Sequence, residues 1–225
     1  MSAGSATDAL NLRFKRENTA EQVAGALRDL IVEGRIPPGT HLREGPLSTQ
    51  LGVSRNTVRE ATQILIGQGL ANREIHRGAY VIQPTIEDVH DLFRTRRLVE
   101  LAAAREAALT HKGVEELQAA VDGLEAALAS GDMARVSSAD LVCHRTLVDL
   151  VHGGRLAALF GSVEAESRLC LSMTGGAGAD SDRLLADHRA LLDALAEGDT
   201  ERAVAVLDEH LADSELRLVT HLTSS

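Results

Sequence analysis

Residues 47–61 read LSTQLGVSRNTVREA, two short helical segments on either side of a glycine. Gly52 marks a tight turn, because glycine adopts backbone angles that other residues avoid. The pattern predicts a short helix over residues 45–51 before that turn. A second helix is expected to begin after Ser54, a residue favoured at helix N-termini, and to end near Gly69. The stretch therefore predicts a helix, a tight turn and a second helix.

The second of these helices has an apolar side and a polar side when its residues are spaced by about 100°. The apolar side carries Thr57, Val58, Ala61, Ile64 and Leu65. The opposite side carries Arg55, Asn56, Arg59 and Gln63. Arginine pairs with guanine edges in the DNA major groove, and Asn or Gln pairs with adenine edges. A merely solvated helix surface would show the same polarity, so the pattern by itself leaves both interpretations open.

The flanking sequence extends this unit in both directions. A helix is expected from Thr19 to Gly34, since apolar residues recur there at three- and four-residue spacing. The Ile36-Pro37-Pro38-Gly39 segment ends it. Residues 70–83 predict two short strands around a hairpin at positions 76–78, and Pro84 marks a domain boundary. We expect a flexible arm over residues 1–18, a first domain over 19–83 and a linker over 84–86.

Beyond Pro84 the sequence predicts only helices. Glycines separate six periodic segments near residues 86–109, 113–130, 132–152, 155–173, 181–197 and 199–222. Aromatic residues make up 2% of the chain and there is no Trp, whereas Ala and Leu are abundant. Such a composition favours helices packed on helices. The expected fold is mainly α, with an N-terminal three-helix unit and hairpin followed by an all-α bundle over residues 87–222. The glycine-rich stretch at 175–178 is interpreted as a plain connector.

Charge is distributed unevenly along the chain. Of its 23 Lys and Arg and 33 Asp and Glu, residues 1–85 hold ten basic and eight acidic side chains, and the remainder holds 13 and 25. A mildly basic head on an acidic body suggests nucleic-acid contact by the head. No apolar run approaches the roughly 20 residues of a membrane helix, and no signal peptide is recognised. We expect a cytoplasmic protein without membrane contact, in which Cys143 and Cys170 are buried thiols.

Four polar residues of the helical half fall on apolar helix faces. Asp140 and His144 lie four residues apart on one helix, and His188 and His210 lie on two others. Burying such groups without partners costs several kcal/mol, so they are expected to meet partners. One carboxylate and three imidazoles suit a divalent transition metal such as Zn²⁺, Ni²⁺, Mn²⁺ or Fe²⁺. Core histidines with other partners are the alternative, because spacing does not prove that the four converge.

The segment from Ala20 to Val81 resembles the winged helix-turn-helix of GntR-family regulators. The resemblance rests on Gly34-Arg35-Ile36-Pro37-Pro38-Gly39, Leu47-x-x-x-Leu51-Gly52-Val53-Ser54-Arg55, Val58-Arg59-Glu60-Ala61, Leu65, Gly69-Leu70 and His76-Arg77-Gly78-Ala79-Tyr80-Val81. It implies a three-helix DNA-binding domain with a β-hairpin wing. Asn56-Thr57 replaces the usual Thr-Pro or Ser-Pro, and Gly45-Pro46 replaces longer polar residues, so the operator sequence stays undetermined.

The resemblance also implies which side chains contact DNA. Carried over to this chain, the main contacts are Arg55, Asn56, Arg59 and Gly78. The secondary candidates are Arg43, Ser54, Thr57, Arg73, His76 and Arg77. Phosphates would be held by arginines and by the N-terminus of the recognition helix.

Residues 87–222 resemble the FCD sensor domain of the FadR branch of that family. The matching elements are Arg96-x-x-x-Glu100, Asp140-x-x-x-His144, Asp187-His188-Arg189-Ala190-Leu191 and His210-Leu211. In metal-containing members the residues matching Asp140, His144, His188 and His210 bind the ion. Arg96 is then expected to clamp a carboxylate effector, with a helix-surface Arg96–Glu100 pair as the alternative. Arg168 is a further effector-binding candidate.

Together these features predict a homodimeric transcription regulator rather than an enzyme. Two recognition helices would read a pseudo-palindromic operator. We expect repression relieved by a small organic acid bound at the metal site, with activation as the alternative. A metalloenzyme and a direct metal sensor are competing hypotheses. The metalloenzyme is disfavoured because the sequence offers no convincing additional general base near the proposed metal site and because an enzyme would not need the head.

Overall fold

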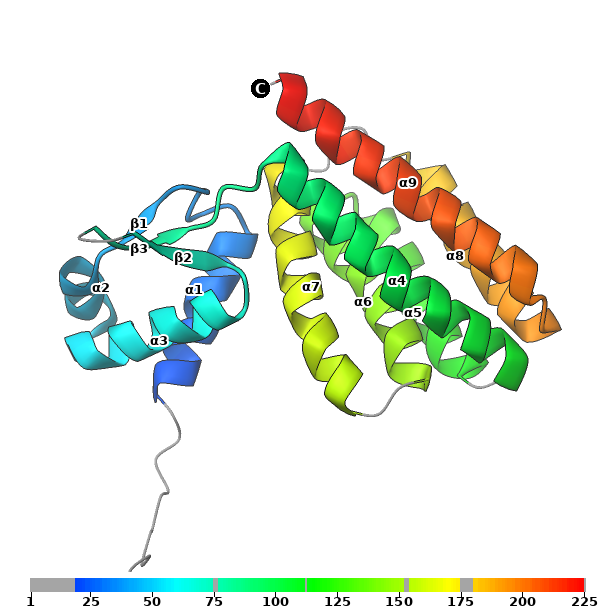
Figure 1. The fold of residues 1–225 in the computed structure, drawn as a ribbon, viewed down its shortest axis with the longest axis horizontal. Helices are drawn as coiled ribbons and strands as arrows, with labels where there is room; N and C mark the ends of the chain where they lie inside the picture. Colours follow the sequence, from blue (N-terminus) through cyan, green and yellow to red (C-terminus); the bar gives the residue numbers. More distant parts are fainter. Residues whose placement is uncertain (1–18, 75–76, 112, 152–153, 175–179, 225) are drawn as a thin grey trace, which may run out of the picture.

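The computed structural model describes residues 19–74, 77–111, 113–151, 154–174 and 180–224. The predicted arm over residues 1–18, the wing residue His76 and the connector at 175–178 lie outside the described residues. The chain forms an N-terminal head and a larger helical bundle, which we call the sensor (Figure 1). The mainly α fold with a small antiparallel sheet is therefore confirmed.

The described residues of the head form three helices and a three-stranded sheet. Its elements are α1 (Thr19–Val32), β1 (His41–Leu42), α2 (Glu44–Leu51), α3 (Arg55–Gly67), β2 (Ala71–Glu74) and β3 (Gly78–Val81). The strand order is β1-β3-β2, and both pairs are antiparallel. The two-residue strand β1 was not expected, because two residues are too few to show an alternating pattern.

Local sequence signals explain the turn before α3. Gly52 is left-handed, with φ 65°, and its N–H bonds to the carbonyl of Ser48. Ser54 then caps α3, since its Oγ accepts a hydrogen bond from the Thr57 N–H at 3.0 Å. At the other end Gly69 is also left-handed, with φ 72°, two residues beyond the last residue of α3.

In the part of the sensor that the structure describes there are six helices, each within two residues of its expected bounds. They are α4 (Ile86–Thr110), α5 (Val114–Ser130), α6 (Met133–Val151), α7 (Gly154–Thr174), α8 (Ser181–Glu197) and α9 (Thr200–Ser224). The core takes large side chains from all of them, for example Phe93, Leu124, Leu147, Phe160, Leu195 and Leu207. Among the described residues no helix is long and apolar enough to cross a membrane.

Helix α7 connects the sensor to the head (Figure 1). Its residue Leu169 is buried in the same apolar cluster as Leu27 and Leu65 of the head. One turn earlier, the side chain of Glu166 lies against Gly69, so closely that a methyl group at Gly69 would collide with it. The division into residues 19–83 and 87–222 stays a prediction, but the head core is completed by a sensor helix.

Candidate metal centre and DNA-binding surface

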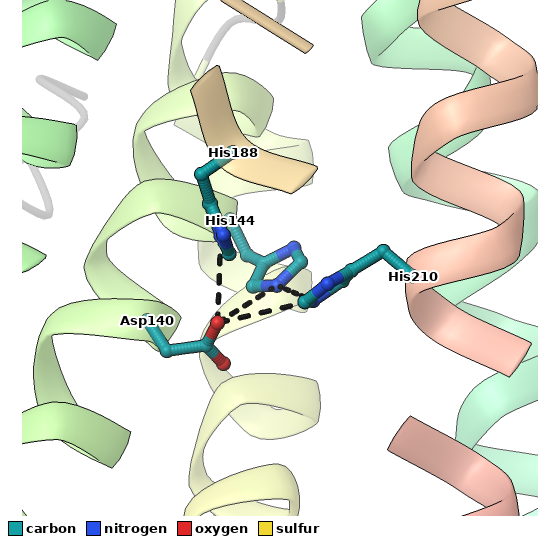
Figure 2. Close-up of side chains that lie close together, drawn as sticks. All are labelled: Asp140, His144, His188 and His210. Atoms are coloured by element: carbon teal, nitrogen blue, oxygen red, sulfur yellow. Dashed lines mark hydrogen bonds and ion pairs between the residues drawn. The ribbon is translucent and has the colours of Figure 1, made fainter. Parts of the chain in front are cut away.

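Three helices bring the four predicted metal ligands together at one point inside the sensor. Asp140 and His144 project from the same side of α6, as i and i+4 residues do, while His188 comes from α8 and His210 from α9 (Figure 2). All four are buried. One ligand atom from each lies within 4.8 Å of the others.

The Nε2 atoms of the three histidines surround one carboxylate oxygen. Asp140 Oδ1 lies 3.4 Å from Nε2 of His188, 3.7 Å from Nε2 of His144 and 3.8 Å from Nε2 of His210. Within the described part of the chain this buried oxygen has no hydrogen-bond partner. Two atoms bound to one transition metal at about 2.1 Å lie roughly 3.0–3.4 Å apart, so the spacing is close to that of a ligand set. The residues fit a divalent ion.

Each histidine is oriented by an oxygen at its other ring nitrogen. Nδ1 of His144 lies 2.6 Å from Glu100 Oε2, and Nδ1 of His210 lies 3.3 Å from Asp187 Oδ2. Nδ1 of His188 lies 2.9 Å from the carbonyl oxygen of Leu184. Because these oxygens only accept hydrogen bonds, the three Nδ1 atoms carry protons, and in the neutral rings Nε2 keeps its lone pair. Such outer partners are typical of metal-binding histidines.

The pKa values of Asp140 and His144 are shifted toward their charged forms, whereas that of His188 is shifted toward its neutral form. Burial opposes ionisation of Asp140, but the neighbouring histidines, His144 above all, outweigh it and hold its pKa far below the usual range. Burial also opposes protonation of His144, yet Glu100 and Asp140 raise its pKa to about 9. Burial and the charge on His210 lower the pKa of His188 to about 4. A site that holds an ionised carboxylate and keeps one imidazole neutral suits a cation.

Arg96 is connected to this cluster through Glu100. Its Nε donates to Glu100 Oε1 at 2.7 Å, and both side chains are almost fully buried, at 3% and 0% exposed. The alternative of a helix-surface pair is thus wrong, because α4 turns this face into the bundle. Arg96 Nη2 is buried and has no partner among the described residues. Arg96 and His144 therefore share one carboxylate, and the guanidinium keeps a donor unused.

Arg168 lies in a different environment. On α7 it donates from Nη1 to Ser138 Oγ at 2.8 Å and from Nη2 to Glu164 Oε1 at 3.0 Å. It lines a groove of about 750 Å³ between α1 of the head and the sensor. The structure thus places Arg168 at the boundary between head and sensor, and its hydrogen bonds go there rather than to the histidine cluster.

The exposed face of α3 carries the predicted DNA-contacting side chains. Arg55, Asn56 and Arg59 are exposed, whereas Val58 beneath them is buried. Arg59 makes a bidentate ion pair with Glu44 of α2, at 2.8 and 2.7 Å. The contact of Glu44 with Arg59 was not predicted from the sequence, because a contact across 15 residues leaves no periodic signal.

A groove between α3 and the wing gathers most of the remaining candidates. Its volume is about 630 Å³, and its lining includes Arg43, Arg59, Arg73, Arg77 and Gly78. Gly78 has φ 90°, which favours glycine. Arg77 is paired with Glu74 at 3.0 Å. Ser54 and Thr57 stand at the N-terminus of α3, bonded to each other at 2.8 Å. The structure therefore gathers four arginines around one groove, where the Glu44 and Glu74 carboxylates pair with two of them.

A winged helix-turn-helix head packed on a helical bundle that buries an Asp-His cluster is the architecture of a DNA-binding regulator. Residues 19–81 match the family described as bacterial regulatory proteins, gntR family, and residues 91–213 match the FCD domain. The chain belongs to the GntR family of bacterial regulatory proteins and carries an FCD domain.

Individual proteins support this assignment. The chain is 32% identical, over 91% of both chains, to the probable D-xylose utilization operon transcriptional repressor of Paenarthrobacter nicotinovorans. It is 27% identical to the galactonate operon transcriptional repressor of Escherichia coli, with 89% of this chain and 97% of that protein covered. A solved GntR regulator from Rhodococcus sp. RHA1 shares 35% identity with a TM-score of 0.81, over 89% of this chain and 97% of that one.

Proposed function

We propose that this protein is a cytoplasmic, homodimeric repressor that binds a pseudo-palindromic operator and responds to a small carboxylate bound at a metal site in the sensor. The observation that carries the proposal is the pair of unsatisfied buried atoms, Asp140 Oδ1 and Arg96 Nη2, joined through Glu100 and His144. A cation and an anion at these positions would satisfy both atoms.

The metal ligands would be Asp140, His144, His188 and His210. The hard carboxylate and the three imidazoles suit Zn²⁺, Ni²⁺, Mn²⁺ or Fe²⁺. A divalent ion there supplies positive charge and coordination positions that four protein ligands leave open, which favours binding of an anionic ligand. Glu100 and Asp187 keep the rings of His144 and His210 in the binding tautomer.

Arg96 would contact the carboxylate of the effector. Its Nε already donates to Glu100, whereas the buried Nη2 has no partner among the described residues and could donate a charge-assisted hydrogen bond to a carboxylate. Arg168 would act only as a secondary contact, because Ser138 and Glu164 engage its guanidinium. A sugar acid is a suitable effector, since the galactonate repressor is among the relatives.

On the DNA side, Arg55, Asn56 and Arg59 would enter the major groove, and Gly78 would bring the wing backbone close to the duplex. The supporting contacts would come from Arg43, Ser54, Thr57, Arg73, His76 and Arg77. Glu44 presents the guanidinium of Arg59 in a fixed orientation. Two such heads would read the two half-sites.

Helix α7 would connect the two functions. It packs on α4 and α6, which hold Arg96 and the first two metal ligands, and it places Leu169 in the head core. Effector binding changes operator affinity only if the effector favours one arrangement of the heads. A rigid helix shared by both cores provides a physical route for that preference.

The test begins with selection of duplexes from a random library by the zinc-loaded protein. Fluorescence anisotropy on the selected duplex then compares protein alone with protein plus galactonate, D-xylose or EDTA. We expect galactonate to weaken binding and D-xylose, which lacks a carboxylate, to have no effect. Release by EDTA without any organic ligand would favour the direct metal sensor, and turnover of galactonate would favour the metalloenzyme. No sequence preference under any of these conditions would refute the proposal.

A further inference from the structure

The outer face of α4 carries an apolar residue between two opposite charges. Asp91, Leu98 and Arg105 follow one another at intervals of seven residues, so each lies about 20° around the helix from the next and the outer two lie about 40° apart. Leu98 is 73% exposed, and the Asp91 side chain is 76% exposed. The buried residues of α4, such as Phe93 and Ala104, lie on the other side. This stripe is therefore a face of the bundle that no described helix covers.

Neighbouring residues widen the stripe into a surface. Helix α9 lies beside α4, and both helices lie at the front of the sensor in Figure 1. Arg97 of α4 links them, because it forms ion pairs with Asp208 at 3.0 Å and with Glu215 at 2.7 Å. Leu216 of α9 is 65% exposed. Between the helices is a groove of about 460 Å³, lined by His90, Arg94, Arg97, Leu98, Leu101 and Glu215. Leu98 and Leu101 line this groove together, and a contiguous exposed apolar patch is typical of an interaction site.

The order of the charges along α4 indicates that a second copy of the chain covers this face. A two-fold interface requires a surface that complements itself. If two copies of α4 pack antiparallel about Leu98, Asp91 of each copy faces Arg105 of the other, because both lie seven residues, about 10 Å, from the centre. Each Leu98 then meets its counterpart, flanked by the groove. Parallel packing would instead place like charges together.

We propose that the face formed by Asp91, Leu98, Arg105 and the groove beside Leu98 is the two-fold interface of the protein, with two α4 helices antiparallel about Leu98. The inference rests on the homodimer of the proposed function and assigns its surface. Leucines at the centre would be desolvated, and the two ion pairs at the rim would set the register.

Sedimentation equilibrium of the full-length wild type, Leu98→Asp and Leu159→Asp tests the face. Leu159 on α7 is 68% exposed, so it is a matched control outside the stripe. Leu98→Asp is expected to raise the dimer dissociation constant at least about 30-fold, as loss of a central interface residue does. Leu159→Asp should leave it unchanged, and circular dichroism should show both variants folded. Equal behaviour of the two variants overturns the assignment.

Charge exchange tests the register. Asp91→Arg and Arg105→Asp should each weaken the dimer by roughly tenfold, because like charges then face each other. The double variant should recover wild-type affinity, and failure to recover overturns the antiparallel packing. A wild type that stays monomeric, even with operator duplex, refutes the dimer of the proposed function. A dimer whose dissociation constant is unchanged by Leu98→Asp refutes only this interface.

Discussion

Replacing Asp140 with Asn should remove the stabilisation that the protein gains from metal. The substitution keeps the shape of the side chain but removes the only anionic ligand, whose Oδ1 lies 3.4–3.8 Å from three histidine Nε2 atoms. Asn would present a neutral oxygen or an amide to the ion. The wild type should therefore melt at a higher temperature with Zn²⁺ than with EDTA, and Asp140→Asn should show almost no difference.

The size of the effect follows from binding linkage. Free metal at 100 times its dissociation constant stabilises the folded state by about 2.7 kcal/mol. For a protein of 225 residues, 1 kcal/mol changes the Tm by roughly 2–4 °C. The wild-type difference between Zn²⁺ and EDTA should then be about 5–10 °C. In Asp140→Asn it should fall below about 2 °C.

Two further variants make the test specific. Asp187→Asn weakens the hydrogen bond to His210 Nδ1 without removing a ligand. Loss of an outer partner typically costs 10–100-fold in metal affinity, so an intermediate Tm difference is expected. Asp193→Asn changes an exposed carboxylate on the same helix and serves as the control. It should behave as the wild type.

The assay is differential scanning fluorimetry of chelator-treated protein with and without Zn²⁺, with the bound metal counted by mass spectrometry. The Tm difference between Zn²⁺ and EDTA should be largest in the wild type and Asp193→Asn, smaller in Asp187→Asn and smallest in Asp140→Asn. If Asp140→Asn retains both the metal and the full Tm difference, Asp140 is not a ligand and the proposed coordination set is wrong.

Three other predictions follow from single contacts. Arg59→Ala should weaken operator binding in anisotropy titrations by about 5–150-fold, the usual cost of a lost base contact. The Tm of this variant should stay within about 3 °C of the wild type, because the ion pair with Glu44 is exposed. Arg35→Ala, which removes an exposed arginine paired with Glu33, is the control for loss of charge. Burial raises the pKa of both Cys143 and Cys170 to about 12, so neither thiol of the folded protein should react with a disulfide reagent at pH 8. Both thiols should react once the protein is unfolded in guanidinium. Fast labelling of the folded protein would contradict this prediction. Burial and the charges of Asp88 and Asp91 raise the pKa of Glu166 above 4.5, so its ionisation destabilises the fold above that raised pKa and not below pH 4.5. Glu166→Gln should therefore increase the Tm at pH 7.5 but not at pH 4. An equal change at both pH values would refute the raised pKa of Glu166.

Arg96 illustrates where prediction from sequence stops. Its spacing from Glu100 predicts an ion pair on any face of a helix. Whether that pair is exposed or buried depends on which helices cover the face. In the structure α6 covers it and supplies His144, and the pair becomes part of the candidate metal centre.

For the candidate metal centre, too, the sequence predicts only part of the arrangement. Asp140 and His144 fall on one face by helical periodicity, so the sequence predicts that they meet. His188 and His210 lie 44 and 66 residues beyond His144, and periodicity does not show whether they point at it. Without the family resemblance, their convergence follows only from the packing of α8 and α9 on the bundle.

Helix bounds, the capped turn between α2 and α3 and the polar face of the recognition helix were determined by the chain alone, because hydrogen bonds and side-chain preferences within a few residues specify them. The burial of Arg96, the Glu44–Arg59 pair, strand β1 and the contact of Glu166 with Gly69 were decided only by tertiary structure. These contacts join residues distant in sequence, and their formation depends on how whole helices pack, which no local pattern encodes.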